Sequence, residues 1–256
     1  PFICYNKFAT FHGTLTVTPQ LLSGSGEMDF LKAFITSKHF DLLQHRVTSD
    51  TANFNLRVTD SLSGIAFATN NMRSDIDFQK RVGEFTSNQS GSVVKFPANQ
   101  YIAYMDEFKW FMDEDEIELG ANKKKVTETA DAKDIQLSGS RFISVAPNQD
   151  SLQFISPQAR YSLQKYRITA RQVPYIDVAD ARIVPDSGNV TIYRNAYMQP
   201  LVNATITANK VTKYYTIYKA NINITSRKNY AGSGYYDFID GAKNKRPMFF
   251  SNIRVD

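Results

Sequence analysis

The chain has 256 residues, of which 42% are hydrophobic and 13% aromatic, and its formal net charge is +5. A chain of this length and composition can bury a sizeable core, which excludes a disordered polypeptide. A disulfide scaffold is excluded because Cys4 has no partner cysteine, and no window approaches the roughly 20 apolar residues of a membrane-spanning helix.

Apolar and polar residues alternate along most of the chain, which is typical of strands with one buried face and one wet face. Residues 30–43 also fit an amphipathic helix. Because their neighbours alternate by two, we expect short strands at 33–37 and 40–42 instead. The clearest alternation occurs at residues 14–18, 52–58, 159–163, 166–170, 204–208 and 220–225.

An alanine two positions before a larger apolar residue recurs in six of the predicted strands, at irregular intervals near 20 residues. This pattern predicts an all-β fold, either an elongated β-solenoid or an open β-jellyroll of stacked short rungs; a compact β-sandwich is the alternative. We expect one elongated β domain over residues 1–256, cut from a longer chain, with a polar loop insertion at 120–135. The six pairs are Ala33-x-Ile35, Ala52-x-Phe54, Ala159-x-Tyr161, Ala181-x-Ile183, Ala204-x-Ile206 and Ala220-x-Ile222.

An acidic segment at residues 105–119 is the strongest candidate for chemistry. Asp113, Asp115 and Glu118 offer oxygen ligands of the kind that Ca²⁺ prefers. A pair of these carboxylates beside Trp110 also fits a glycosidase site, with the indole as a sugar platform. The simpler interpretation is a hairpin: residues 108, 110 and 112 point inward, 113–116 make the turn, and 117 and 119 begin the return strand.

No other motif in the sequence predicts catalysis. The histidines lack zinc-type spacing, and neither a nucleophile elbow nor a phosphate-binding glycine loop occurs. We therefore expect a protein that is not an enzyme, has no metal centre and needs no cofactor.

The C-terminal part, from residue 189 onward, is basic and rich in tyrosine. Interleaved rings and cations suit an anionic lipid or polysaccharide, or a solvated face. Nucleic acid is disfavoured because no RNA-recognition or OB signature occurs.

Two resemblances emerge once the strands are laid out. Residues 150–163, continuing through 168–170 and 176–181, resemble the layered β-jellyroll repeat of lipopolysaccharide-transport bridge proteins. Over most of its length the chain is also similar to very large, uncharacterised, β-rich envelope proteins of Gram-negative bacteria. This second resemblance rests on four segments, residues 24–28, 49–52, 96–101 and 232–237.

The first resemblance implies an apolar groove between open sheet edges that shields acyl chains. No motif residue marks such a groove, so its lining is expected from the inward strand positions, which would form plain core in a closed solenoid. The candidates are Phe54, Leu56, Tyr161, Leu163, Ile168, Ile206, Ile222 and Ile224.

We therefore expect a non-enzymatic structural or scaffold segment of a large protein of the bacterial cell envelope, in the periplasm or on the outer surface. Its expected partners are other segments of its parent chain or copies of itself, bound at its ends. Two alternatives remain: a lipid- or lipopolysaccharide-binding bridge with an apolar groove, and a carbohydrate-active β-helix protein.

Overall fold

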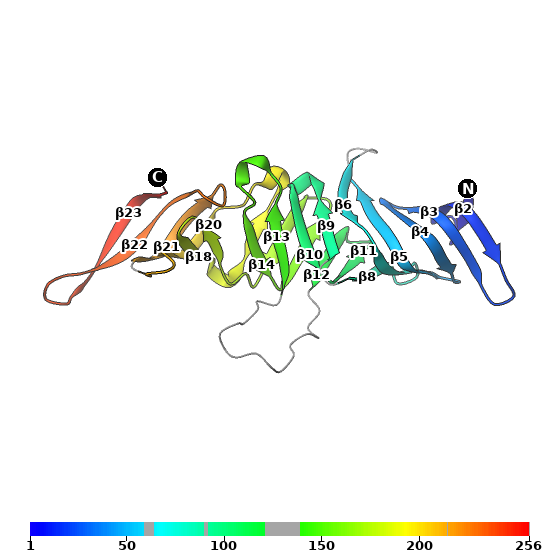
Figure 1. The fold of residues 1–256 in the computed structure, drawn as a ribbon, viewed down its shortest axis with the longest axis horizontal. Helices are drawn as coiled ribbons and strands as arrows, with labels where there is room; N and C mark the ends of the chain where they lie inside the picture. The colour runs from blue at the N-terminus through cyan, green and yellow to red at the C-terminus, as the bar shows by residue number, and fades with distance from the viewer. Residues whose placement is uncertain (59–63, 90–91, 121–138, 214, 256) are drawn as a thin grey trace, which may run out of the picture.

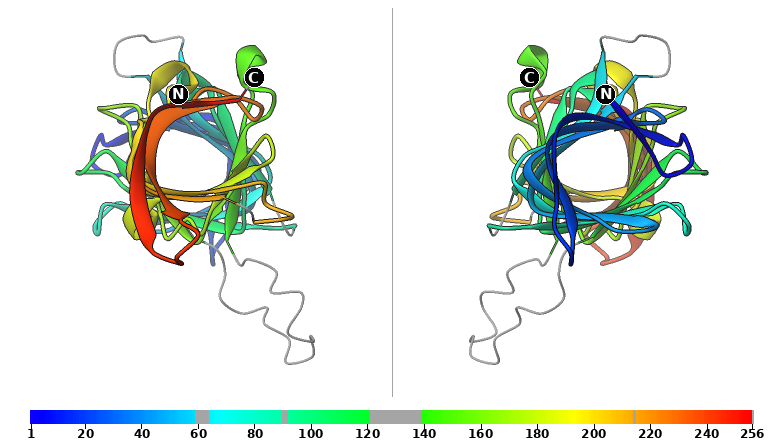
Figure 2. Two further views of the ribbon diagram at one scale, coloured as in Figure 1. Left: turned by 90° about the vertical axis from the view of Figure 1, so that its left-hand side faces the viewer. Right: turned by 90° about the vertical axis from the view of Figure 1, so that its right-hand side faces the viewer.

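The structure, a computed structural model, describes residues 1–58, 64–89, 92–120, 139–213 and 215–255. The body is elongated, with the two chain termini toward opposite ends (Figure 1). End-on views show the strands curling round the long axis (Figure 2). The described regular structure consists of β-strands and four short 3₁₀ turns.

The larger sheet contains most of the strands and curls strongly. Its members are β1 (Phe2–Cys4), β2 (Ala9–Val17), β3 (Leu22–Phe30), β4 (Ala33–Leu42), β5 (Arg46–Arg57), β6 (Ile65–Thr69), β7 (Met72–Asp77), β8 (Val82–Ser87), β9 (Ser92–Phe96), β10 (Tyr101–Met105), β11 (Glu107–Phe111), β12 (Glu116–Gly120), β13 (Ser140–Ser144), β14 (Gln153–Ser156), β15 (Gln158–Ser162), β16 (Arg167–Arg171) and β19 (Val190–Ile192).

A second sheet, in the order β17-β18-β20-β21-β22-β23, forms the C-terminal end of the body (Figure 1). Its strands are β17 (Ile176–Val178), β18 (Ala181–Val184), β20 (Leu201–Ala208), β21 (Tyr215–Ile224), β22 (Tyr230–Ile239) and β23 (Lys245–Arg254). The 3₁₀ turns are η1 (Pro97–Asn99), η2 (Pro147–Gln149), η3 (Asp186–Gly188) and η4 (Arg194–Ala196).

The larger sheet divides at β5 into two walls. The first half of β5 pairs with β7, whereas its last residues pair with β6. From β7 the first wall continues through β8, β11, β12, β15, β16 and β19. From β6 the second wall continues through β9, β10, β13 and β14. Every pairing between described strands in this sheet and in the second sheet is antiparallel.

Successive hairpins along the chain belong alternately to the first wall and to the second wall. The pairs β7–β8, β11–β12 and β15–β16 lie on the first wall, and β9–β10 and β13–β14 lie on the second. A single residue, Asp106, separates β10 from β11, and a single residue, Pro157, separates β14 from β15. The chain therefore passes from one wall to the other at tight corners, and the inward side chains of the two walls face each other across the interior.

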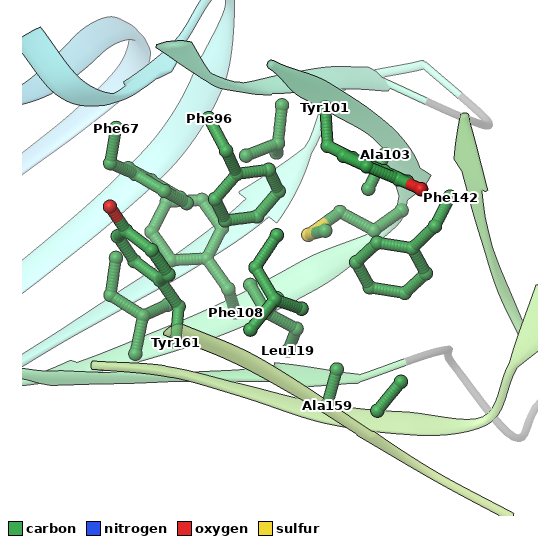
Figure 3. Close-up of a cluster of buried hydrophobic side chains, with 14 of the residues drawn as sticks. Phe67, Phe96, Tyr101, Ala103, Phe108, Leu119, Phe142, Ala159 and Tyr161 are labelled. Atoms are coloured by element: carbon green, nitrogen blue, oxygen red, sulfur yellow. The ribbon is translucent and has the colours of Figure 1, made fainter. Parts of the chain in front are cut away.

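Aromatic side chains fill the space between the walls (Figure 3). The ring of Phe67 on the second wall lies 5.0 Å from that of Phe108 on the first, and Phe96 lies 5.0 Å from Tyr161. The Tyr161 hydroxyl also donates to the carbonyl of Ala66 across the interior, at 3.3 Å. Burial of this much aromatic surface is a major source of stability, since each ring removes roughly 150–250 Å² from water.

The structure confirms the all-β fold, and the residues predicted as two short strands, 33–37 and 40–42, form one continuous strand, β4. Residues of all six alanine pairs are buried in one continuous core that extends across both sheets. The alanine repeat is therefore a pattern of inward positions. The predicted loop insertion at 120–135 lies outside the described residues, apart from Gly120 at the end of β12.

Candidate functional site

The acidic segment forms the predicted hairpin of β11 and β12, with the turn at residues 112–115. Phe108, Trp110 and Met112 point inward and are buried. The indole of Trp110 is fully enclosed, with its ring 5.4 Å from that of Phe54 and 5.8 Å from that of Phe30. An indole in this position packs the core and offers no open face on which a sugar ring could stack.

The three candidate carboxylates of the segment each pair with a different basic side chain. Asp113 accepts from the guanidinium of Arg81 at 2.8 Å, and Asp115 pairs with Lys32 at 2.5 Å. Glu118 pairs with Arg160 at 3.2 Å across the β12–β15 ladder. Among the described residues, no group of three or more acidic, histidine or cysteine side chains is placed to hold a metal ion. Each of the three candidates is thus paired with a basic side chain, and Arg160 is shared with Glu116 at 3.5 Å.

All eight groove candidates lie in the packed core, and none exposes more than 3% of its surface. Phe54 and Tyr161 belong to the aromatic cluster between the walls, and Ile206, Ile222 and Ile224 line the inside of the second sheet. The middle of the body is therefore closed by side chains. An accessible apolar surface has to be sought at its ends.

The inside of the second sheet stays uncovered at its C-terminal end. Gly234 faces the interior, because a Cβ built there would lie 2.6 Å from Cγ2 of the core residue Ile217. Side chains two positions apart on a strand share a face, and so do directly paired residues. Tyr236 and Phe238 therefore face inward with Gly234.

The same register places Phe250, opposite Gly234, and Met248, opposite Tyr236, on this face. The ring contacts agree with this assignment of faces, since the ring centroid of Tyr236 lies 5.7 Å from that of Tyr215 and 6.3 Å from that of Phe250. The exposed fractions reach 53% for Tyr215 and 41% for Phe250. We call this surface the open inner face; its members are Tyr215, Tyr236, Phe238, Met248 and Phe250.

A shallow cleft of about 470 Å³ lies on the open inner face. Besides Tyr215, Tyr236 and Phe250, it is lined by Ile217, whose side chain is also part of the core. The apolar interior of the body thus continues without a break onto a solvent-exposed surface. Large exposed apolar patches of this kind mark interaction sites for proteins or lipids.

The edge of the same sheet is unpaired. Within the described chain β23 pairs only with β22, so one row of its backbone N–H and C=O groups faces outward. Lys245, Arg246 and Pro247 blunt the start of this edge, as charged residues and proline commonly do. Residues 248–253 carry no such protection and include Met248, Phe249 and Phe250.

The opposite end of the body shows a weaker version of the same arrangement. Phe2 on β1 pairs with the core residue Phe11 and is 45% exposed, and Leu22 and Val17 form an exposed pair at the end of the β2–β3 ladder. Both ends therefore combine a strand edge with exposed apolar side chains.

The sequence interpretation missed the open inner face. It grouped the C-terminal tyrosines with the lysines as one basic, aromatic surface. The strand register instead divides the tyrosines between the two faces of the sheet. On the outer face Tyr218, Tyr235 and Phe249 form a row with ring separations of 6.1 and 5.1 Å. Adjacent residues of a strand lie on opposite faces, so the neighbouring Tyr235 and Tyr236 were the signal that could have separated the two sets.

Comparison of the chain with protein-family models and with curated proteins found no match. In the described part of the chain, no helix has the length and apolarity needed to cross a bilayer.

Proposed function

We propose that this chain is a non-enzymatic structural segment of a bacterial cell-envelope protein, a stiff open β-jellyroll that joins β-structured partners at its ends. The observation that carries the proposal is the open inner face: an apolar core surface that runs out to an unpaired strand edge. The jellyroll description rests on antiparallel hairpins that alternate between two walls. The envelope location rests on the resemblance of the sequence to large β-rich envelope proteins.

Two physical effects would stabilise the end-to-end contact: backbone hydrogen bonding and burial of apolar surface. An added strand would satisfy the free backbone groups of residues 248–253, as in other cases of strand addition. The same contact would bury the rings of the open inner face, with a gain of roughly 25 cal/mol per Å² of apolar surface before association costs. The partner would be another β-rich segment of the parent chain or a second copy of this chain.

Sedimentation velocity over a wide concentration range tests the second-copy form of the proposal. We expect concentration-dependent association that Phe250→Asp weakens by at least about tenfold, since a charge on this face would be buried unpaired. Val145→Asp is the matched control, because Val145 is 54% exposed on the middle of the body. A protein that stays monomeric throughout, or equal effects of the two variants, contradicts self-association through this end.

The cleft on the open inner face favours a second candidate, a lipid- or lipopolysaccharide-binding bridge. Its lining of Tyr215, Ile217, Tyr236 and Phe250 would accept part of an acyl chain. Mass spectrometry of organic extracts of the folded protein, purified from an envelope fraction, separates the two candidates. Stoichiometric phospholipid or lipid A that is lost in Phe250→Asp would favour the bridge, and a clean extract would favour the structural segment.

A further inference from the structure

A second, chemically different cleft lies where the two sheets meet. It has a volume of about 320 Å³ and lies between β13–β14 of the second wall and the β17 edge of the C-terminal sheet. Three basic side chains line it, Arg141, Lys210 and Arg227, against one carboxylate, Asp177. This cleft shares no lining residue with the cleft on the open inner face.

The carboxylate offsets only part of this positive charge. Asp177 accepts two hydrogen bonds from the guanidinium of Arg182, at 2.9 and 3.1 Å, and Lys210 approaches it only to 3.9 Å. Within the described part of the chain, the side chains of Arg141 and Arg227 make no ion pair or hydrogen bond. The cleft therefore carries a surplus of positive charge, which attracts an anion.

The backbone that carries each cation is fixed by hydrogen bonds. The N–H of Arg227 donates to the carbonyl of Gln149 at 3.0 Å, and its own carbonyl accepts from Ala179 at 2.8 Å. The N–H of Lys210 donates to the backbone carbonyl of Asp180 at 2.7 Å. Arg141 lies on a strand that is paired on both sides, with β10 and β14. The backbone positions of the three cations are therefore fixed, and only their side chains have to become ordered when a ligand binds.

Apolar and aromatic groups complete the cleft. Ile155 pairs directly with Arg141 across the β13–β14 ladder, and Tyr175 lies at the other side. The Tyr175 ring is held in place by the guanidinium of Arg182, which lies 3.6 Å from the ring centroid. The ligand that suits these surroundings is an anion joined to a small organic body.

We propose that this cleft binds a phosphoryl group, carried either by a small organic phosphate or by a lipid headgroup. Two arginine forks match the oxygen geometry of phosphate, and a lysine supplies a third, more flexible charge. The volume suits a ligand of the size of a sugar phosphate. Binding here does not require the end-to-end association proposed above, because the two surfaces are separate.

The test uses the whole chain and two probes at constant ionic strength in a phosphate-free buffer. The first is glucose 6-phosphate, with binding followed by titration calorimetry. The second is a phosphatidylcholine vesicle containing phosphatidic acid, compared with pure phosphatidylcholine in co-sedimentation. The variants are Arg141→Gln and Arg227→Gln. Lys38→Gln on β4 is the control, because it removes the same charge from an exposed site outside the cleft.

We expect each arginine variant to weaken binding by at least about tenfold, as loss of a charge-assisted hydrogen bond does, and Lys38→Gln to leave it unchanged. Binding of glucose 6-phosphate with this variant pattern identifies a soluble organic phosphate. Binding to the acidic vesicles alone, with the same pattern, identifies a lipid headgroup. Absence of binding in both arms, or equal weakening by the control variant, overturns the proposal.

Discussion

The side-chain amide of Asn99 donates a 2.7 Å hydrogen bond to the backbone carbonyl of Tyr166, although 67 residues separate them in the chain. A longer contact of 3.4 Å reaches the carbonyl of Ile192. Asn99 is fully buried at the end of η1, so one amide ties the corner between β9 and β10 to the β15–β16 turn and to the end of β19. Buried carbonyls of this kind are costly to leave unpaired.

Replacement of this amide should therefore destabilise the whole body. We expect Asn99→Leu to lower the free energy of unfolding by about 1–3 kcal/mol, because the carbonyl of Tyr166 loses its donor. Urea denaturation followed by circular dichroism measures the change. Asn148→Leu is the control: Asn148 is exposed in η2, a similar proline-initiated turn, and should shift stability by less than about 0.5 kcal/mol. Equal costs for the two variants would disprove the role assigned to Asn99.

Close packing at Gly234 predicts a second stability effect. A methyl group at this position would meet Ile217 at 2.6 Å and Ala220 at 3.1 Å, so the β21–β22 ladder would have to shift. We expect Gly234→Ala to cost about 1–3 kcal/mol of unfolding free energy through overpacking. Gly241→Ala is the matched control, since no atom lies within 4 Å of a Cβ there. A thermal melt that ranks Gly241→Ala as the more damaging variant would count against the described register.

The enclosed indole of Trp110 can be tested by fluorescence, because this chain has a single tryptophan. We expect blue-shifted emission in the folded protein, little quenching by acrylamide, and a shift to the red on unfolding. N-acetyltryptophanamide gives the fully exposed reference. Strong quenching in the folded protein would show that the indole is accessible, as a sugar platform requires, and would contradict its place in the core.

Buried tyrosines predict a loss of stability at alkaline pH. Burial raises the pKa of Tyr101 and of Tyr161 well above their ordinary value of 10.0. Above pH 10 the unfolded chain releases these protons while the folded chain keeps them, so stability is complete below pH 10 and falls as the pH rises further. Each such group contributes a slope of up to about 1.4 kcal/mol per pH unit.

Tyr161→Phe should remove part of this alkaline slope, in addition to a constant cost from the lost bond to Ala66. The measurement is the free energy of unfolding at several pH values between neutrality and the alkaline transition. If the variant and the parent protein lose stability with the same slope, the titration of Tyr161 does not contribute to alkaline unfolding.

Local patterns in the sequence were sufficient to predict several structural elements. Alternation along residues 108–119 predicted the β11–β12 hairpin, its inward residues and its acidic turn, because a strand pair with a short turn depends only on neighbouring residues. The alanine pairs marked inward positions for the same reason. The predicted groove residues were all inward, but the sequence left open whether the interior is a groove or a core.

Asn99 and Gln149 show where such reasoning ends. Both are polar residues of proline-containing turns, which favours exposure, yet both are buried and bond carbonyls of distant loops, at Tyr166 and at Ala196. The basic cleft is similar, since Arg141 and Arg227 meet only where the two sheets adjoin.

The sequence by itself determined that this protein is all-β and which side of each strand is apolar, because the strand period and the turn residues are local properties of the chain. Only the tertiary structure decided that the hairpins alternate between two walls, that their rings close the middle of the body, and that the apolar face opens at the C-terminal end. Those features depend on pairings such as β12 with β15, in which strands separated along the chain meet, and a local pattern of hydrophobicity is compatible with many such pairings.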